Sequence, residues 1–370
     1  MILQNDFKRQ WRAIGPQVLE AVQRVGTSGW YILGKEVEEF EKALAQFWGV
    51  THAVGVGNGM DALEIGLRCL DLQPGNKVVT TPLSAFATTL AILRAGAVPV
   101  FVDVDELGRI RLDQCRRLLD PDRAIRFLVP VHLYGFALDM RELQRLKDDF
   151  DILIIEDCAQ SIGATYRGVS AGTVGQVAAT SFYPTKNLGA LGDGGALLTN
   201  DDGIASTARS LRNYGQASQY IHAEIGLNSR LDEIHAAILK TALLPHLSRW
   251  TETRRTIAHS YRERIDNPRL RTPLPETDMN PVWHLFPVTV EEGRDALREH
   301  LGSLEILSGV HYPRIIPDQA ALAAYGRYEV ACDLKNALRF ANTGLSLPIH
   351  PFLRDNEVEA VISACNSWTP

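Results

Sequence analysis

Apolar residues follow two different spacings along the first half of the chain. Short, nearly continuous apolar runs predict buried strands at residues 53–57, 77–80, 98–102, 125–131 and 152–155. Between them, apolar positions at helical spacing predict helices over residues 61–70, 85–95, 112–119 and 140–147. Strands that alternate with helices and are apolar on both faces favour an α/β fold, with a mainly parallel central sheet and helices on both faces.

Helical spacing also flanks this region. Amphipathic helices are expected over residues 14–25, 36–48, 204–213 and 231–244, and a further helix is expected from Pro245 to about Ile265. Ser229, with Asp232 three residues on, is a capping signature for the helix at 231–244.

A shift in composition follows, because four prolines lie between residues 267 and 281. Beyond it, a strand over residues 283–290 and four short helices predict a smaller α+β unit. We therefore expect a large domain over residues 1–245 and a small C-terminal domain over residues 246–370.

The most informative turn lies between two predicted strands, Val177–Phe182 and Gly195–Thr199. Proline and several glycines exclude a helix between them and allow the backbone to approach another group closely. Lys186 lies in this turn. A partly desolvated lysine loses its proton more easily, and the free amine forms a Schiff base with an aldehyde. The alternative is a solvated loop lysine.

Residues that follow the strands carry further signals, because ligands of such sheets bind at the carboxyl ends of the strands. The segment 55–61, GVGNGMD, opens a helix and can offer N–H groups to a phosphate, although on this segment alone a tight turn without a ligand is the favoured interpretation. Phe86 follows the second strand and can line the site or pack in the core. Asp157 ends a buried strand, where a carboxylate is costly unless it meets a positive or protonated partner.

Composition narrows the classes of partner. The 370 residues carry a formal net charge of -6 without a basic stripe or tail, so neither nucleic acid nor an anionic membrane is expected. No apolar run reaches membrane-spanning length, and the first residues lack a signal-peptide core. The five cysteines and ten histidines are scattered, which favours free thiols in the cytoplasm and predicts no metal site.

A lysine amine, a carboxylate at a strand end, an aromatic ring and a glycine-rich helix start together suit pyridoxal 5'-phosphate (PLP). The lysine can hold the aldehyde, and the carboxylate can keep the pyridine nitrogen protonated, so that the ring accepts electrons from the substrate carbon. The aromatic ring can stack on the pyridine, and the helix N–H groups can hold the phosphate.

The sequence also resembles a known family, the sugar aminotransferases of the DegT/DnrJ/EryC1/StrS type, a branch of the fold-type I PLP enzymes. The resemblance covers nearly the whole chain. Five segments carry it in order: 130–135 PVHLYG, 156–160 EDCAQ, 181–195 SFYPTKNLGALGDGG, 211–215 LRNYG and 226–232 GLNSRLD. It implies the fold-type I architecture with a smaller α+β C-terminal domain.

The resemblance also assigns roles to cofactor-binding residues. Lys186 matches the Schiff-base lysine, which also moves the proton between the substrate carbon and the cofactor. Asp157 matches the partner of the pyridine nitrogen, and Gln160 matches the residue that bonds the ring hydroxyl. Phe86 falls at the stacking position. The phosphate contacts fall on Gly59, Met60 and Ser181; at Met60 only the backbone N–H carries over, because relatives usually have a small or hydroxyl residue there.

Further matches concern the substrate and a second chain. In the family, the residue at Asn228 reaches the cofactor phosphate of the neighbouring subunit, which implies a homodimer with shared active sites. Tyr183, His311 and Tyr312 fall near the site of the sugar nucleotide. The implied reaction has two halves: L-glutamate gives its amine to PLP, and the amine then passes to a keto group of a nucleotide-linked sugar.

Within the family, the segments resemble most the enzymes that aminate C3 of dTDP-3-oxo-6-deoxyhexoses. Amination at C4 and UDP-linked 3-oxo sugars remain alternatives. A PLP sugar dehydratase is disfavoured because such relatives have histidine where this chain has Lys186. A Rossmann oxidoreductase would need an acidic residue about 20 positions after the glycine loop, where Thr80 and Thr81 lie. A non-catalytic regulator of the same fold is a further alternative.

Overall fold

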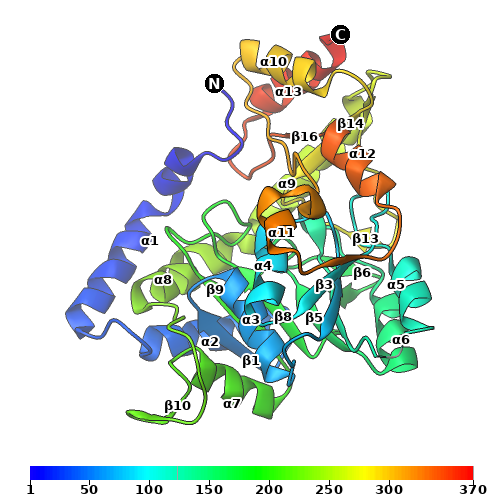
Figure 1. Cartoon of the computed structure of the whole chain (residues 1–370). Coiled ribbons are helices and arrows are strands. Elements are labelled where there is room, and N and C mark those ends of the chain that lie inside the picture. Colours follow the sequence, from blue (N-terminus) through cyan, green and yellow to red (C-terminus); the bar gives the residue numbers. More distant parts are fainter. Residues whose placement is uncertain (123, 370) are drawn as a thin grey trace.

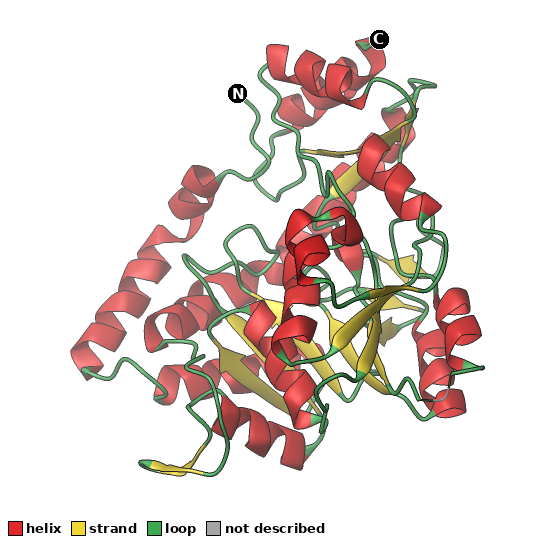
Figure 2. Cartoon of the chain, in the orientation of Figure 1, coloured by secondary structure: helices red, strands yellow, loops and turns green. Residues whose placement is uncertain are grey.

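The computed structural model describes residues 1–122 and 124–369. An eight-stranded sheet forms its centre, with the strand order β1-β9-β8-β5-β4-β2-β3-β15 (Figures 1 and 2). β9 is antiparallel to both of its neighbours, and the other neighbouring strands run parallel. The bounds are β1 His52–Val56, β2 Lys77–Thr80, β3 Val98–Phe101, β4 Phe127–Val129, β5 Leu153–Asp157, β8 Val177–Ser181, β9 Gly195–Thr199 and β15 Glu329–Val330. The predicted mainly parallel α/β sheet is confirmed.

Helices cover both faces of this sheet. The helices of the first two thirds of the chain are α1 Phe7–Ser28, α2 Lys35–Trp48, α3 Gly59–Cys69, α4 Phe86–Arg94, α5 Leu112–Leu119, α6 Met140–Phe150, α7 Asp202–Leu211, α8 Glu233–Ile238 and α9 Leu247–Arg264. Apolar residues of α3, α4 and α7 form one core cluster, and those of α2, α5 and α6 belong to the other. Two-sided burial explains why the strands are apolar throughout.

Side-chain alternation along β5 decides which residues face the site. Ile155 lies in the cluster under α3 and α4, and Ile154 lies in the cluster on the other face. Because successive side chains of a strand point to opposite faces, Asp157 shares the face of Ile155 and Glu156 shares that of Ile154.

The C-terminal part adds a smaller unit, most of which lies at the top of Figure 1 together with both chain ends, whereas its helix Ala320–Tyr325 lies lower in the view. Its three-stranded antiparallel sheet has the order β12-β14-β16. Its elements are β12 Leu270–Arg271, β14 Phe286–Val290, α10 Arg294–Ser303, α11 Ala320–Tyr325, α12 Lys335–Thr343, β16 Gly344–Leu347 and α13 Asp355–Ser367. Ile2 pairs with Ile306, so the first residues of the chain contact this unit. The proposed boundary after residue 245 stays a prediction.

Several elements differ from the expected ones. α1 begins at Phe7 instead of residue 14, because Asp6 caps it by accepting the N–H of Arg9 and the polar first turns hide the helical spacing. The short strands were not predicted, since two or three residues carry no period: β6 Thr165–Tyr166, β7 Val169–Ser170, β10 Gln216–Ser218, β11 Ile221–His222 and β13 Met279–Asn280.

The helix expected over residues 231–244 is also different. α8 begins at Glu233 and is capped by Asp232, whose side chain accepts the N–H of His235, so the expected cap at Ser229 is wrong. Ser229 instead donates to Asp61 and accepts the N–H of Gly57. A π-helical turn over Leu239–Leu243 and a 3-10 turn over Leu244–His246 follow, because Pro245 cannot continue an α-helix.

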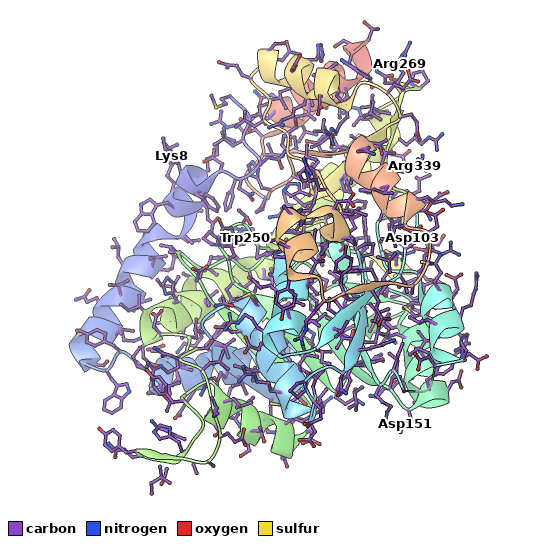
Figure 3. All side chains as sticks on the ribbon, in the orientation of Figure 1. Lys8, Asp103, Asp151, Trp250, Arg269 and Arg339 are labelled. Atoms are coloured by element: carbon purple, nitrogen blue, oxygen red, sulfur yellow. The ribbon has the colours of Figure 1, made fainter. Side chains whose placement is uncertain are left out.

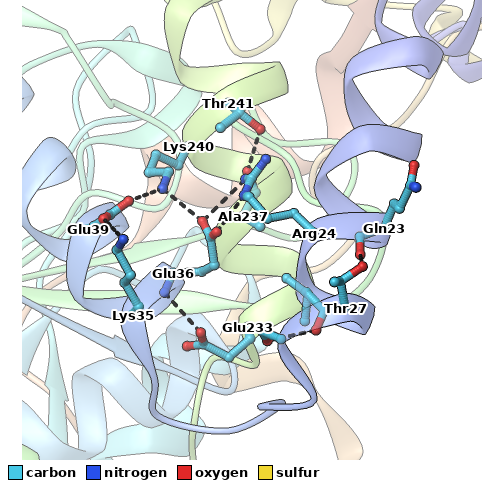
Figure 4. Close-up of polar contacts among 12 residues, drawn as sticks. Gln23, Arg24, Thr27, Lys35, Glu36, Glu39, Glu233, Ala237, Lys240 and Thr241 are labelled. Carbon is cyan, nitrogen blue, oxygen red and sulfur yellow. Dashed lines mark hydrogen bonds and ion pairs between the residues drawn. The ribbon is translucent and has the colours of Figure 1, made fainter.

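Charged side chains fasten α1 and α2 to this helical segment (Figure 4). The Glu36 carboxylate accepts hydrogen bonds from Arg24 at 2.6 Å and from Lys240 at 2.7 Å, and Lys240 also bonds Glu39. The buried carboxylate of Glu233 accepts the N–H groups of Gly34, Glu36 and Val37 at the start of α2. Three segments that are far apart in the sequence are thereby held at fixed positions.

Candidate active site

A cavity of about 270 Å³ opens where β4, β5 and β8 end and α3 and α4 begin. It combines residues from five separate segments of the chain. Seven residues expected from the sequence line it: Gly59, Met60, Asp157, Gln160, Ser181, Tyr183 and Lys186. The carboxyl ends of the strands thus form a single cavity, as the fold class predicts.

Lys186 is held by a tight turn that follows β8. Its N–H donates to the carbonyl oxygen of Tyr183 at 2.8 Å. Gly189 packs against the same turn so closely that a Cβ there would lie 2.3 Å from the carbonyl oxygen of Pro184. A side chain at position 189 would therefore push the turn open, and only glycine fits.

The amine of Lys186 is poised to lose its proton. Burial lowers the pKa of Lys186 to about 8, and the negative charge of Asp157 opposes this shift. At pH 7 roughly a tenth of the amine is therefore neutral and nucleophilic, whereas an exposed lysine would be almost fully charged.

Asp157 stands at the end of β5 with its carboxylate fixed by two hydrogen bonds. Oδ2 accepts the hydroxyl of Thr88 at 2.8 Å, and Oδ1 accepts the N–H of Ala159 at 3.1 Å. The side chain is 6% exposed. It has no salt-bridge partner in the described part of the chain, so its charge is available to a positive group in the cavity.

The first residues of α3 present free backbone N–H groups at the same cavity. Asn58 caps the helix by accepting the N–H of Asp61, and no described residue accepts the N–H groups of Gly59 and Met60. A Cβ at Gly59 would lie 2.7 Å from the Cβ of Ser181, so α3 approaches the end of β8 directly. Free N–H groups at a helix N-terminus favour an anion such as phosphate.

Gln160 links the cavity to the C-terminal unit. Its Oε1 accepts the N–H of Tyr134 at 2.6 Å, and its Nε2 donates to the hydroxyl of Tyr312 at 3.2 Å. The Tyr134 hydroxyl in turn donates to the carbonyl oxygen of His311. The expected residues Tyr312 and His311 therefore lie beside the site, although they do not line the cavity.

Two histidines near Lys186 are held neutral. Burial and the charge of Lys186 lower the pKa of His311 to about 4, and burial is the first cause that lowers the pKa of His284. The His284 Nδ1 faces Oδ1 of Asn187 at 3.2 Å, and Nδ2 of Asn187 donates to a backbone carbonyl. Because this bond fixes the amide, Nδ1 of His284 carries the proton.

Two further expected residues, besides His311 and Tyr312, lie outside the cavity. Phe86 begins α4 and packs against the core, while its neighbours Ala85 and Ala87 line the cavity. Asn228 is exposed on the segment before α8 and bridges Asn213 through the backbone. Neither position excludes the expected role, because an aromatic ring can stack at the rim and an outward side chain can reach a second chain.

Several wall residues were not predicted. Thr88, Val131 and Leu133 line the cavity, and Thr88 fixes the orientation of Asp157. Val131 and Leu133 follow β4, so the strand-end rule could have found them. Nothing in the sequence singled out Thr88, because a threonine in the first turn of a helix does not by itself indicate a functional site.

The side chain of Glu156 lies on the other face of β5 from Asp157 and binds the loop at residues 172–175. Its carboxylate accepts hydrogen bonds from Nε2 of His132 at 2.7 Å and from the N–H groups of Gly172, Val174 and Gly175. Burial alone would raise the pKa of Glu156, but the bond to His132 and these N–H groups lower it. His132, Glu156 and Cys158 lie close together, but four donors already occupy the carboxylate, so the cluster serves structure.

None of the helices in the described residues is long and apolar enough to cross a membrane.

Comparisons with known proteins agree with this geometry. The chain matches the DegT/DnrJ/EryC1/StrS aminotransferase family over residues 12–366. It is 41% identical to a dTDP-3-amino-3,4,6-trideoxy-alpha-D-glucose transaminase of Streptomyces venezuelae, over 98% of this chain and 95% of the relative. It is 39% identical to a dTDP-3-amino-3,6-dideoxy-alpha-D-galactopyranose transaminase of Aneurinibacillus thermoaerophilus, over 95% of each chain.

Solved structures give the same result. The crystal structure of DesV from S. venezuelae superposes with a TM-score of 0.94 at 40% identity, covering 99% of this chain and 98% of DesV. NtdA from Bacillus subtilis, solved with bound cofactor PMP, superposes with a TM-score of 0.86 at 26% identity, covering 95% and 80% of the two chains. The family match and the full-length similarity lead to one conclusion. The chain belongs to the DegT/DnrJ/EryC1/StrS aminotransferase family.

Proposed function

We propose that this protein uses PLP to transfer the amino group of L-glutamate to the C3 keto group of a dTDP-linked 6-deoxy sugar. The observation that carries the proposal is the cavity in which the desolvated amine of Lys186 and the carboxylate of Asp157 lie together with the open start of α3. The two dTDP-3-amino-sugar transaminases among the relatives support the C3 position and the dTDP group.

The residues of the cavity fit PLP. The N–H groups of Gly59 and Met60, with the hydroxyl of Ser181, suit its phosphate. Because position 59 has no Cβ, the start of α3 can lie directly against Ser181, which brings these donors to the same cavity. Asp157 suits a protonated pyridine nitrogen, Gln160 suits the ring hydroxyl and Phe86 offers an aromatic face. Bound PLP supplies an electron sink and a carrier for the amino group.

The side chains at the cavity have separate roles in the proposed reaction. The neutral amine of Lys186 would hold the aldehyde of the cofactor, and the released amine would move a proton between the substrate carbon and the cofactor. Asp157, oriented by Thr88, keeps a proton on the pyridine nitrogen. Tyr183, His311 and Tyr312 are the proposed contacts of the sugar nucleotide. The proposal is supported at Tyr183, which lines the cavity and is 53% exposed.

We also propose that the protein acts as a homodimer. Large apolar side chains are exposed along α1, the turn after it and the Lys186 loop: Phe7, Trp11, Leu19, Trp30, Tyr31, Tyr183 and Leu191. A hollow of about 760 Å³ lies between α1 and residues 183–191. A second copy of the chain would cover this apolar surface, and the outward side chain of Asn228 could then reach the partner's cofactor phosphate.

A cytoplasmic location is proposed as well, supported by the five cysteines, which are all free thiols.

The function is tested by incubating the purified protein with PLP, L-glutamate and a panel of dTDP- and UDP-linked 3-oxo and 4-oxo sugars. Mass spectrometry and NMR identify the product. We expect amination at C3 of a dTDP-linked 6-deoxy sugar, together with formation of 2-oxoglutarate. Amination only at C4, or only of UDP-linked sugars, would reject the proposed substrate, and loss of the reaction in Lys186→Ala identifies the amine that is required.

A further inference from the structure

One buried hydroxyl holds the turn from which α3 begins. Ser229 is 1% exposed, and its Oγ donates to Oδ2 of Asp61 at 2.7 Å and accepts the N–H of Gly57 at 3.0 Å. The free N–H groups at the start of α3 lie between these two contacts, in a segment that we call the phosphate turn (residues 57–61). Ser229 therefore fixes both ends of the phosphate turn from a distant part of the chain.

The carboxylate of Asp61 joins the other bonds of the phosphate turn. Its Oδ2 also accepts Nδ2 of Asn58 at 3.0 Å, and its Oδ1 lies 3.4 Å from Nη1 of Arg94. Oδ1 of Asn58 in turn accepts the N–H of Asp61, so the cap of α3 and this carboxylate hold each other. Neither Asp61 nor Ser229 lines the cavity, so both act on it only through the backbone of the turn.

The backbone next to Ser229 carries Asn228 outward. Asn228 pairs with Asn213 in an isolated antiparallel bridge, and successive side chains of extended backbone point to opposite sides. Ser229 is accordingly buried, and Asn228 is exposed. The last turn of α3 also holds this segment, because Nη1 of Arg68 donates to the carbonyl oxygen of Ile225 at 3.2 Å. Contacts to α3 thus set the position of Asn228.

The surface around Asn228 is open to a second copy of the chain. The hairpin of β10 and β11 precedes Asn228 and projects from the body of the molecule, with its side chains extending away from it (Figure 3). Three large apolar side chains on and just after this hairpin are exposed: Tyr220, Ile221 and Ile225. Because clustered exposed apolar groups mark contact surfaces, Asn228 lies beside a surface that suits a second chain.

We infer that Ser229 positions the phosphate-binding groups of two active sites at once. Through Asp61 it holds the free N–H groups of the phosphate turn in its own chain. Through the adjoining peptide it holds Asn228, which the proposed homodimer directs to the cofactor phosphate of the second chain. The inference rests on the proposed function, because it assumes PLP and shared sites. Loss of the Ser229 hydroxyl then impairs both sites, whereas loss of the Asn228 side chain impairs only one.

The test assigns each effect to one site. Mixed dimers are purified from two differently tagged chains, one of which carries Lys186→Ala. Borohydride then fixes PLP covalently only to the chain that keeps Lys186, which is the reporter chain. Its fluorescence, followed as the PLP concentration is raised, gives the PLP affinity of one known site. A second substitution is placed either on the reporter chain or on the other chain.

Ser229→Ala is expected to weaken PLP binding at the reporter site roughly 5-fold from either chain, the effect of one hydrogen bond. Asn228→Ala is expected to weaken it only from the other chain. If Asn228→Ala behaves in this way but Ser229→Ala acts from only one chain, or from neither, the inference is overturned and the proposed function stands. If Asn228→Ala has no effect from either chain, the shared sites are refuted, and the inference with them.

The matched control is Thr199→Val, which removes another buried hydroxyl. Thr199 ends β9, donates to the carbonyl oxygen of Gln176 and does not line the cavity. We expect Thr199→Val to leave PLP affinity unchanged from either chain. A loss equal to that of Ser229→Ala would show a merely structural effect and overturn the inference.

Two further variants keep the test decisive. Ser229→Thr retains the hydroxyl and is expected to bind PLP as the wild type does. If Ser229→Ala does not fold, Asp61→Asn breaks the same link, because an amide offers one acceptor oxygen where the carboxylate meets donors from Ser229, Asn58 and Arg94. The same loss from either chain is then expected, and wild-type affinity in Asp61→Asn would contradict the inference.

Discussion

The hydroxyl of Thr88 donates a 2.8 Å hydrogen bond to Oδ2 of Asp157, so the first turn of α4 fixes the acid at the end of β5. The two residues are 69 positions apart in the sequence. The bond fixes Oδ2 while Oδ1 accepts the N–H of Ala159, so the carboxylate is held at both oxygens. Thr88 is therefore a positioning residue for the acid that is expected to meet the pyridine nitrogen.

Removing this hydroxyl is expected to weaken cofactor binding. Thr88→Val keeps the shape of the side chain but frees the carboxylate, and we expect PLP affinity to fall roughly 10-fold, the effect of one hydrogen bond to a charged group. Fluorescence titration with PLP measures it. The neighbouring Thr89 is a matched control, because its Oγ1 is buried without a partner. If Thr89→Val weakens PLP binding as much as Thr88→Val, the hydroxyl of Thr88 has no special role.

The capture of PLP by Lys186 is expected to depend on pH with a midpoint near 8. The pKa of Lys186 is lowered to about 8, and only the neutral amine attacks the aldehyde, so the rate rises with pH and levels off above this value. Because the charge of Asp157 raises this pKa, Asp157→Asn moves the midpoint to lower pH. Stopped-flow absorbance gives both curves. A midpoint near 10.5, the ordinary value for lysine, would show that the amine is not desolvated.

Glu156 is expected to stabilise the fold and not to take part in the chemistry. Glu156→Gln places an amide N–H₂ against the donors of His132 and the loop at residues 172–175, and we expect the free energy of unfolding to fall by about 3 kcal/mol. Urea denaturation measures it. Because its pKa is lowered in the folded protein, the stabilisation is present at neutral pH and is lost as the pH falls through that lowered pKa.

The control for this prediction is Glu142→Gln, since Glu142 pairs with Arg116 and Arg145 near the surface. Such pairs contribute about 0–1 kcal/mol. Equal losses in the two variants would mean that burial of Glu156 has no energetic importance.

Sharing of active sites predicts complementation between two inactive chains. Lys186→Ala removes the amine of its own site, and Asn228→Ala removes a contact to the partner's cofactor phosphate. In a mixed dimer both defects fall on the same site, which leaves the other site intact, so activity returns to about half that of wild type per dimer. Activity of tagged, co-purified mixed dimers is the measurement. If the mixed dimers stay as inactive as Lys186→Ala alone, the sites are not shared.

The sequence alone predicted those site residues whose position depends only on the strand that precedes or contains them. Lys186 and Asp157 were expected because each follows an apolar run, and the structure places both on one cavity. Thr88 was not expected, because its role depends on which helix packs next to the end of β5. The cap at Ser229 was predicted wrongly since its hydroxyl is used by Asp61 and Gly57, from a distant part of the chain.

The alternation of β5 sets a limit on how this protein can change. Glu156 anchors a loop on one face, and its neighbour Asp157 serves the cavity on the opposite face. Inserting or deleting a single residue within Leu153–Asp157 would exchange the two acids between the faces. The anchor and the cavity would then be lost together, so such indels are not viable in this strand, whereas a substitution can alter either acid alone.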